Sequence, residues 1–202
     1  MAIQSVDRHP NGGSCGAVIG QAGRSYLLAQ SPAGIFIVDQ HAAHERILFE
    51  EFFREMTAEP VDIQRLLAPI NLEPGPRQAA LIAEKIPLLR DMGIEVESFG
   101  RDAFIITALP ALLTKWGKED LVLEVLGTVD EWEKSPDDPR RSIIIRLACL
   151  AAVKARDSLD PRESDRLIER LFCCREPDIC PHGRPTMIKH SWNDLEKMFK
   201  RT

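Results

Sequence analysis

The stretch V-D-Q-H-A-A-H-E-R-I, residues 38–47, joins a run of apolar residues to a series of polar ones. The apolar residues 35–38 show no polar alternation, which is typical of a buried strand. Asp39 stands where a helix N-cap belongs, and the apolar residues after it recur with helical spacing to about Met56. The sequence therefore predicts a buried strand that passes directly into an amphipathic helix.

Two polar residues share the inward face of this predicted helix. His41 and Glu45 are four positions apart, so their Cβ atoms lie about 6 Å from each other. The same face continues with Leu48, Phe49, Phe52 and Met56. A buried carboxylate without a partner is costly, and a bound metal ion would remove that cost. A solvated helix start with a satisfied core histidine remains the alternative, and His44, which falls off this face, is expected to be exposed.

A second polar segment, C-P-H-G-R-P, occupies residues 180–185. Cys180 and His182 stand two positions apart in a loop that proline and glycine stiffen. A thiolate and an imidazole together suit zinc. Arg184 offers a guanidinium that suits either a bidentate phosphate contact or a stabilising pair with a carboxylate.

A third segment, A-C-L-A-A-V-K-A-R at residues 148–156, is rich in alanine, which indicates a closely packed helix. A single buried cysteine such as Cys149 usually packs as a small hydrophobic residue. Beside the other two polar segments, however, it becomes a candidate metal ligand. Cys173 and Cys174 are expected to pack rather than to bind metal.

The composition is that of an ordinary globular protein. The 202 residues are 44% hydrophobic and 28% charged, and neither a membrane-spanning run nor a signal peptide is visible. These features predict a cytosolic protein, in which five cysteines favour metal binding or burial over disulfides. Residues 140–202 hold 14 basic and 9 acidic side chains, so this third favours contact with a polyanion, although mixed solvated helix faces remain the alternative.

The patterns predict an α+β fold. Strands are expected at 17–21, 25–30 and 35–38, and a separate unit at 71–113 holds a helix over 77–92 and strands over 94–98 and 103–107. Further helices are expected over 121–132, over 143–159, after the capping residue Asp160 and after Ser191. We therefore predict that residues 66–139 form a unit inserted into a subdomain built from both chain ends, residues 1–65 and 140–202.

Together, these segments resemble the C-terminal domain of the DNA mismatch-repair protein MutL in its endonuclease-bearing form. The family motif D-Q-H-A-x-x-E-x-x-x-x-E is matched at residues 39–50, and C-P-H-G-R-P is matched residue for residue at 180–185. The terminal F-x-R is matched at 199–201. The A-C-R/K-like motif is matched only loosely, because Leu150 stands where a basic residue is common. The likeness spans residue 16 to the last residue.

The resemblance implies a homodimeric, metal-dependent endonuclease that nicks one DNA strand by phosphodiester hydrolysis. It makes Asp39, His41 and Glu45 catalytic, and Arg184 and Arg201 contacts to DNA phosphates. The implied metal ligands are His41, Glu45, Cys149, Cys180 and His182. Zn²⁺ would be regulatory or structural, and Mn²⁺ would be catalytic. A zinc-stabilised dimerisation module without catalysis is the alternative, although a structural zinc site needs no bridging glutamate.

The resemblance also implies partners. The segment Q-R-L-L-A-P at residues 64–69 is similar to the family's element for binding the replication sliding clamp, with Gln64, Leu67 and Pro69 as its anchors. A plain edge strand is the alternative. The apolar strands within residues 17–37 are the expected dimer surface. The resemblance thus makes residues 1–65 and 140–202 the dimerisation subdomain, which carries the metal site, and residues 66–139 an inserted regulatory subdomain.

Full-length MutL carries an ATPase region that binds ATP, and the chain is expected to be a fragment that begins after the linker to it. Isolated nicking is therefore expected to be weak. Contact with the mismatch-recognition protein MutS is expected only through the full-length protein. The expected location is the bacterial cytoplasm, in association with the nucleoid.

Overall fold

A computed structural model describes residues 17–115, 117, 119–132, 138–152 and 158–201. The chain has the predicted α+β fold and divides into two compact units. The second unit is Phe49–Ala151, and the first holds the described residues on either side of that segment. The inserted unit is therefore longer than the predicted 66–139, and its regulatory role stays a prediction.

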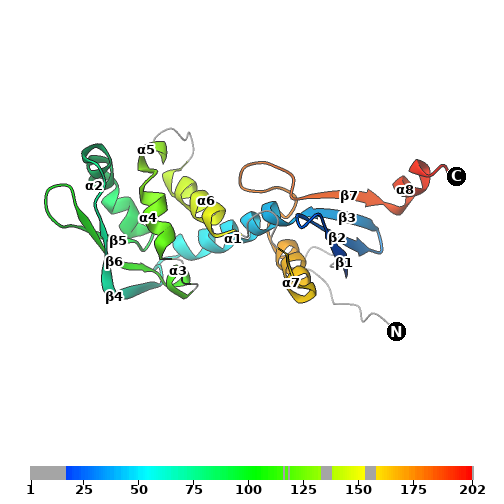
Figure 1. Ribbon diagram of the computed structural model, residues 1–202, viewed down its shortest axis with the longest axis horizontal. Helices are drawn as coiled ribbons and strands as arrows, with labels where there is room; N and C mark the ends of the chain where they lie inside the picture. The colour runs from blue at the N-terminus through cyan, green and yellow to red at the C-terminus, as the bar shows by residue number, and fades with distance from the viewer. Residues whose placement is uncertain (1–16, 116, 118, 133–137, 153–157, 202) are drawn as a thin grey trace. The chain divides into compact units, whose positions relative to one another are not determined.

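The first unit is built on an antiparallel sheet of four strands in the order β1-β2-β3-β7 (Figure 1). The strands are β1 (Ala17–Ala22), β2 (Tyr26–Ser31), β3 (Gly34–Asp39) and β7 (Met187–Ser191). The predicted strands are confirmed, but β7 was not predicted. It pairs closely with β3 because Gly34 has no side chain: a Cβ there would lie 2.1 Å from the carbonyl oxygen of His190.

Helices complete the core of the first unit. The helix α1 (Gln40–Met56) leaves β3 directly, α7 (Pro161–Phe172) packs against the sheet, and α8 (Trp192–Met198) follows β7. The core of this unit is formed by side chains from the sheet and from α1 and α7. Its buried residues are Leu27, Val38, Ala43, Ile47, Leu167, Ile168, Leu171, Cys174 and Met187. The buried position of Cys174 agrees with the packing role expected for it. The same prediction is wrong for Cys173, which is exposed because it caps the C-terminal end of α7 at the surface.

The second unit contains a three-stranded antiparallel sheet in the order β4-β6-β5. Its strands are β4 (Ile63–Leu72), β5 (Glu95–Ser98) and β6 (Phe104–Pro110), and its helices are α2 (Pro76–Asp91), α3 (Ala111–Lys115), α4 (Asp120–Leu126), α5 (Val129–Trp132) and α6 (Pro139–Ala151). The helix predicted over 121–132 is thus two helices, α4 and α5.

Two further features of the helices bear on the predictions. The helix expected over 143–159 begins earlier, at Pro139, and residues 153–157 lie outside the described part of the chain. Along the described residues, none of the helices combines the length and the apolar character that crossing a membrane requires.

Candidate metal centre

The junction between β3 and α1 is held by Asp39. Its Oδ1 accepts a hydrogen bond of 2.9 Å from the backbone N–H of Ala42, which is the geometry of a helix N-cap. The backbone N–H of Asp39 donates to the carbonyl oxygen of Thr186, which follows the C-P-H-G-R-P segment. The capping role predicted for Asp39 is therefore confirmed, and the same residue ties the start of α1 to the end of that loop.

Glu45 is a buried carboxylate at the centre of a polar cluster. Its side chain is 2% exposed, and its Oε1 lies 3.2 Å from Nε2 of His41, one helical turn earlier. Its Oε2 lies 3.5 Å from Nδ1 of His182 and 3.2 Å from a terminal guanidinium nitrogen of Arg184. Two segments far apart in the sequence thus bring two imidazoles and a guanidinium to one carboxylate.

The donor atoms of this cluster fit a divalent metal ion. Two ligands that bind a tetrahedral zinc ion at about 2.0–2.1 Å lie roughly 3.3 Å from each other. The His41–Glu45 and His182–Glu45 separations of 3.2 and 3.5 Å are close to that value. Cys180, which is 1% exposed, adds a thiol to the same loop as His182. Imidazole, carboxylate and thiolate together are a donor set that suits zinc.

The C-P-H-G-R-P loop owes its shape to two backbone hydrogen bonds. The N–H of Gly183 donates to the carbonyl oxygen of Cys180 over 2.9 Å, and the N–H of Cys180 donates to the carbonyl oxygen of Arg184 over 2.8 Å. Gly183 has a φ of 81°, in the left-handed region that favours glycine. The turn therefore requires this glycine. It brings the backbone of Arg184 next to that of Cys180.

Arg184 links the two halves of the cluster electrostatically. A side-chain hydrogen bond to Cys180 and the negative charge of Glu45 both raise the pKa of Arg184 above its ordinary value, so the guanidinium stays protonated. Of the two roles predicted for this residue, the pair with a carboxylate is present. Its contact with a phosphate stays a prediction.

One residue near the cluster escaped the sequence analysis. Arg46 follows Glu45 on α1, and its side chain is 3% exposed. Its Nε donates a 2.5 Å hydrogen bond to the carbonyl oxygen of Ile179, and a terminal nitrogen lies 3.2 Å from the carboxylate of Glu176. Arg46 therefore fastens the segment that precedes Cys180 to α1. The only signal in the sequence is an arginine that interrupts the apolar residues of an inward-facing helix.

Three other residues named in the sequence analysis are His44, Cys149 and Arg201. The prediction that His44 is exposed is wrong: it is half-buried, because α1 is covered on more than one face and its neighbours Ala43 and Ile47 are buried. Cys149 is half-buried on α6 in the second unit, and its role as a ligand stays a prediction. Arg201 is exposed, with its guanidinium carbon 5.9 Å from the ring centroid of Phe199.

The predicted clamp-binding segment lies on β4, an edge strand of the second unit. Its pairing with β6 breaks between Arg65 and Ile70, so the residues between them bulge from the sheet. Leu67 is fully exposed, and Gln64 and Pro69 are exposed as well. The segment is thus an edge strand, as the alternative reading expected, and it also presents all three predicted anchors to solvent.

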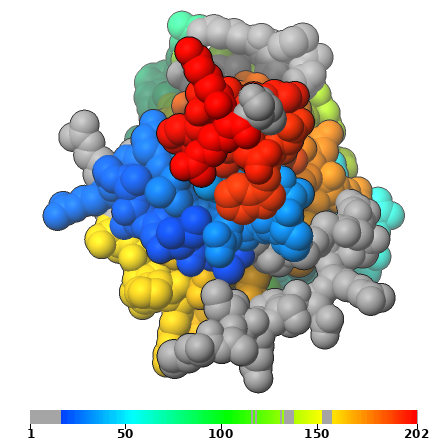
Figure 2. Space-filling model, turned by 90° about the vertical axis from the view of Figure 1, so that its right-hand side faces the viewer, coloured from blue at the N-terminus to red at the C-terminus, as the bar shows by residue number. Residues whose placement is uncertain are grey.

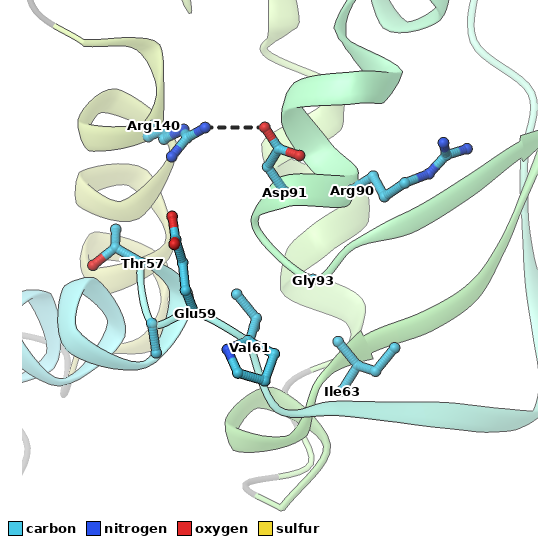
Figure 3. A pocket seen from close by; sticks show the side chains of 10 residues that line it. Thr57, Glu59, Val61, Ile63, Arg90, Asp91, Gly93 and Arg140 are labelled. Carbon is cyan, nitrogen blue, oxygen red and sulfur yellow. Dashed lines mark hydrogen bonds and ion pairs between the residues drawn. The ribbon is translucent and has the colours of Figure 1, made fainter.

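A hollow of about 410 Å³ lies near the start of β4 in the second unit (Figure 3). Its lining includes Val61, Ile63 and Arg90, and an ion pair of 3.0 Å joins Arg140 to Asp91 at one side. None of the site residues predicted from the sequence lines it.

Comparison with known proteins identifies the family. Residues 19–159 match the family described as the MutL C terminal dimerisation domain. The chain is 39% identical to the DNA mismatch repair protein MutL of Endomicrobium trichonymphae over 184 aligned residues. The aligned region covers 91% of this chain and 31% of that protein. The MutL of Symbiobacterium thermophilum is also 39% identical, over 91% of this chain and 30% of its own length. The MutL of Syntrophobacter fumaroxidans is 40% identical, with shares of 92% and 28%.

The three relatives match nearly the same share of this chain. The chain spans less than a third of the length of each of these relatives. The family match, over residues 19–159, includes the whole of α1. The chain therefore belongs to the family of MutL C-terminal dimerisation domains.

Proposed function

We propose that this domain is a metal-dependent endonuclease that nicks DNA in mismatch repair, forms a homodimer and docks on the replication sliding clamp. The observation that carries the nuclease proposal is the buried Glu45 carboxylate, flanked within 3.5 Å by the imidazoles of His41 and His182. Such a group is costly to bury without a strong cationic partner. Arg184, 3.2 Å away, supplies one positive charge, and a divalent ion held by the imidazoles would add the further charge that a catalytic site uses.

In this proposal each residue of the cluster has a defined task. His41, Glu45, Cys180 and His182 would hold divalent ions: the nitrogen and sulfur ligands suit Zn²⁺, and the oxygen ligands suit Mn²⁺. The ion supplies charge stabilisation for the phosphodiester and lowers the pKa of the attacking water. Cys149 from α6 would add a second thiolate.

The chain's own residues orient the substrate around that ion. The guanidinium groups of Arg184 and Arg201 are suited to bind phosphates of the nicked strand. Asp39 holds the start of α1, through its bond to the N–H of Ala42, so that His41 and Glu45 keep their orientation. We assign the catalytic role of Asp39 to its other carboxylate oxygen, Oδ2, because Oδ1 accepts the capping bond.

The nuclease proposal is tested by plasmid nicking with bound metal measured in parallel. Supercoiled plasmid, manganese and the sliding clamp are incubated with the domain and with Asp39→Asn, Glu45→Gln and Glu45→Lys variants. We expect the Glu45 variants to lose both bound zinc and nicking, and Asp39→Asn to lose nicking. Glu55→Gln is a matched control, because it removes an exposed acid from the same helix. Nicking that survives substitution of both Asp39 and Glu45 would reject the site.

A zinc-stabilised module without catalysis is the second candidate. The observation that favours it is that Asp39 already serves as an N-cap, which is a structural role. In that case the Glu45 variants lose zinc and stability, whereas the unchanged domain shows no nicking with manganese and clamp. The same experiment therefore separates the two candidates.

The proposed dimer surface is the outer face of the four-stranded sheet. Leu28, Ile37 and Ile188 are direct cross-strand partners and so share one face. Their sequence neighbours Leu27 and Val38 are buried on the opposite face, in the core. Ile188 is 56% exposed, which leaves apolar surface for a second copy to cover. Figure 2 shows the blue strands and the red C-terminal segment together on one face of the molecule.

Substitution of Ile188 tests this surface. Ile188→Glu places a charge in the middle of the proposed interface, so light scattering after size exclusion should report a monomer. Leu67→Glu is the matched control, because it adds the same charge at another exposed apolar side chain, outside this sheet. A dimer that persists in Ile188→Glu would show that another surface is used.

The clamp proposal is supported by the exposure of β4. An extended peptide with exposed side chains on an edge strand can enter a preformed pocket on a partner. The double variant Gln64→Ala, Leu67→Ala should abolish co-elution with the clamp. Gln78→Ala with Leu81→Ala on α2 is the control pair, and unchanged co-elution of the first pair would reject the proposal.

A further inference from the structure

We propose that Arg184 competes with the metal ion for Glu45, so that its guanidinium acts as an internal cation that sets the metal affinity of the centre. This inference rests on the metal site proposed above. It concerns a residue that the proposed site uses only to bind DNA phosphates.

The competition follows from which oxygen each group contacts. Oε2 of Glu45 lies 3.5 Å from Nδ1 of His182 and 3.2 Å from the guanidinium of Arg184. An ion shared by His182 and Glu45 would bind this same oxygen, next to a group that is already positively charged. Like charges at such a distance repel strongly when the carboxylate between them is shielded from water.

The same guanidinium also contacts the second type of ligand. Arg184 forms a side-chain hydrogen bond with Cys180, the thiol of the centre. A thiolate bound to zinc directs its electron density to the ion, which weakens it as an acceptor for Arg184. Both contacts of Arg184 inside the cluster are therefore contacts that a metal ion would weaken.

The exposure of Arg184 permits it to leave the cluster. Its side chain is 61% exposed, whereas that of Glu45 is 2% exposed. A long, flexible side chain at the surface can turn towards solvent at little cost. A guanidinium released by the metal is then free to bind a phosphate of DNA, which connects metal loading to substrate binding.

The test compares zinc affinity in Arg184→Gln, Arg184→Lys and Glu45→Gln with that of the unchanged domain, by competition with a chromogenic chelator. Arg184→Gln should bind zinc more tightly, on the order of tenfold, because the competing charge is gone. Arg184→Lys keeps the positive charge, so its zinc affinity should lie between those of Arg184→Gln and the unchanged domain. Arg166→Gln, which removes an exposed charge on α7, is the matched control and should leave the affinity unchanged.

Thermal unfolding gives a second readout that a purely structural arginine would not reproduce. In excess chelator, Arg184→Gln should melt at a lower temperature, because Glu45 loses its cationic partner. In saturating zinc that difference should shrink or reverse. An arginine that only supports the loop would lower the melting temperature equally in both conditions, and that result would overturn the inference.

The outcomes also separate this inference from the proposed function. If Glu45→Gln binds zinc as well as the unchanged domain, the proposed metal site itself is wrong. If Glu45→Gln loses zinc but Arg184→Gln binds it equally or more weakly, only the competition is rejected.

Discussion

The cluster around Glu45 and the edge strand β4 both present a short sequence motif, but the fold treats the two motifs in opposite ways. Around Glu45 the fold removes water: the carboxylate is 2% exposed and meets an arginine 139 positions later in the chain. At β4 the fold leaves the motif open, because Leu67 is fully exposed where pairing with β6 breaks. A site for a small ion needs shielded charges, whereas a site for another protein needs an accessible backbone and side chains.

The core of the first unit shields the cluster, so a substitution in that core should affect both stability and zinc binding. Leu171 is fully buried on α7, where it packs with Leu27 and Ile47. Leu171→Ala should lower the free energy of unfolding by about 2–5 kcal/mol, because it removes buried apolar atoms and leaves a cavity. Urea denaturation measures this loss, and zinc binding should weaken with it.

The matched control for this substitution lies in the second unit. Ile106 is equally buried there, on β6. Ile106→Ala should lower the free energy of unfolding by a comparable amount, whereas the zinc affinity of the folded protein should not change. Equal losses of zinc affinity in both variants would mean that the two units do not support separate sites.

A second substitution removes the link between α1 and the loop that carries Cys180. Arg46→Met keeps most of the side-chain volume but loses the bonds to Ile179 and Glu176. We expect a loss of about 1–3 kcal/mol, since the carbonyl group of Ile179 loses a part-buried hydrogen bond to a charged donor. Zinc affinity should fall as well, because Cys180 and His182 are no longer held against α1.

The measurement for Arg46→Met is zinc competition at a temperature where the variant is folded by circular dichroism. Arg54→Met is the control, because Arg54 lies on the same helix and is 70% exposed. A normal zinc affinity in folded Arg46→Met would show that the loop reaches its position without this anchor.

Local patterns predicted the parts of the fold that depend on local forces. Asp39 was identified as an N-cap because capping involves only the next three residues. The four-residue spacing of His41 and Glu45 was sufficient to place both on one face of α1. The anchors of β4 were found from a motif alone, and their exposure required no partner elsewhere in the chain.

The parts that the sequence analysis missed depend on residues far apart. The strand β7 mixes apolar, basic and polar residues, and it is held by pairing with β3 more than 140 positions earlier. The bond from Arg46 to Ile179 spans 133 positions. Neither has a periodic pattern or a turn signal of its own, so single-sequence reasoning had nothing local to detect.

A smaller effect is expected from a purely local contact in the first unit. Asp160 caps α7: its Oδ1 accepts from the N–H of Glu163, whose carboxylate accepts from the N–H of Asp160, both over 2.8 Å. Asp160→Ala should lower the free energy of unfolding by about 1 kcal/mol, because one backbone N–H loses its partner. Thermal denaturation measures it, and Asp165→Ala on the same helix is the control. A loss as large as that of Leu171→Ala would mean that capping, rather than packing, holds α7 in place.

The smallest effect on stability is expected at the motif that the fold leaves open. Leu67→Ala should change the free energy of unfolding by less than about 0.5 kcal/mol, because a fully exposed side chain loses no packing. The same substitution should weaken clamp binding, measured by surface plasmon resonance with immobilised clamp. Ile70, half-buried on the same strand, provides the contrast: Ile70→Ala should cost more stability. If Leu67→Ala destabilises the domain as much as Ile70→Ala, then Leu67 packs against the protein in solution, and this segment of β4 is not accessible to a partner.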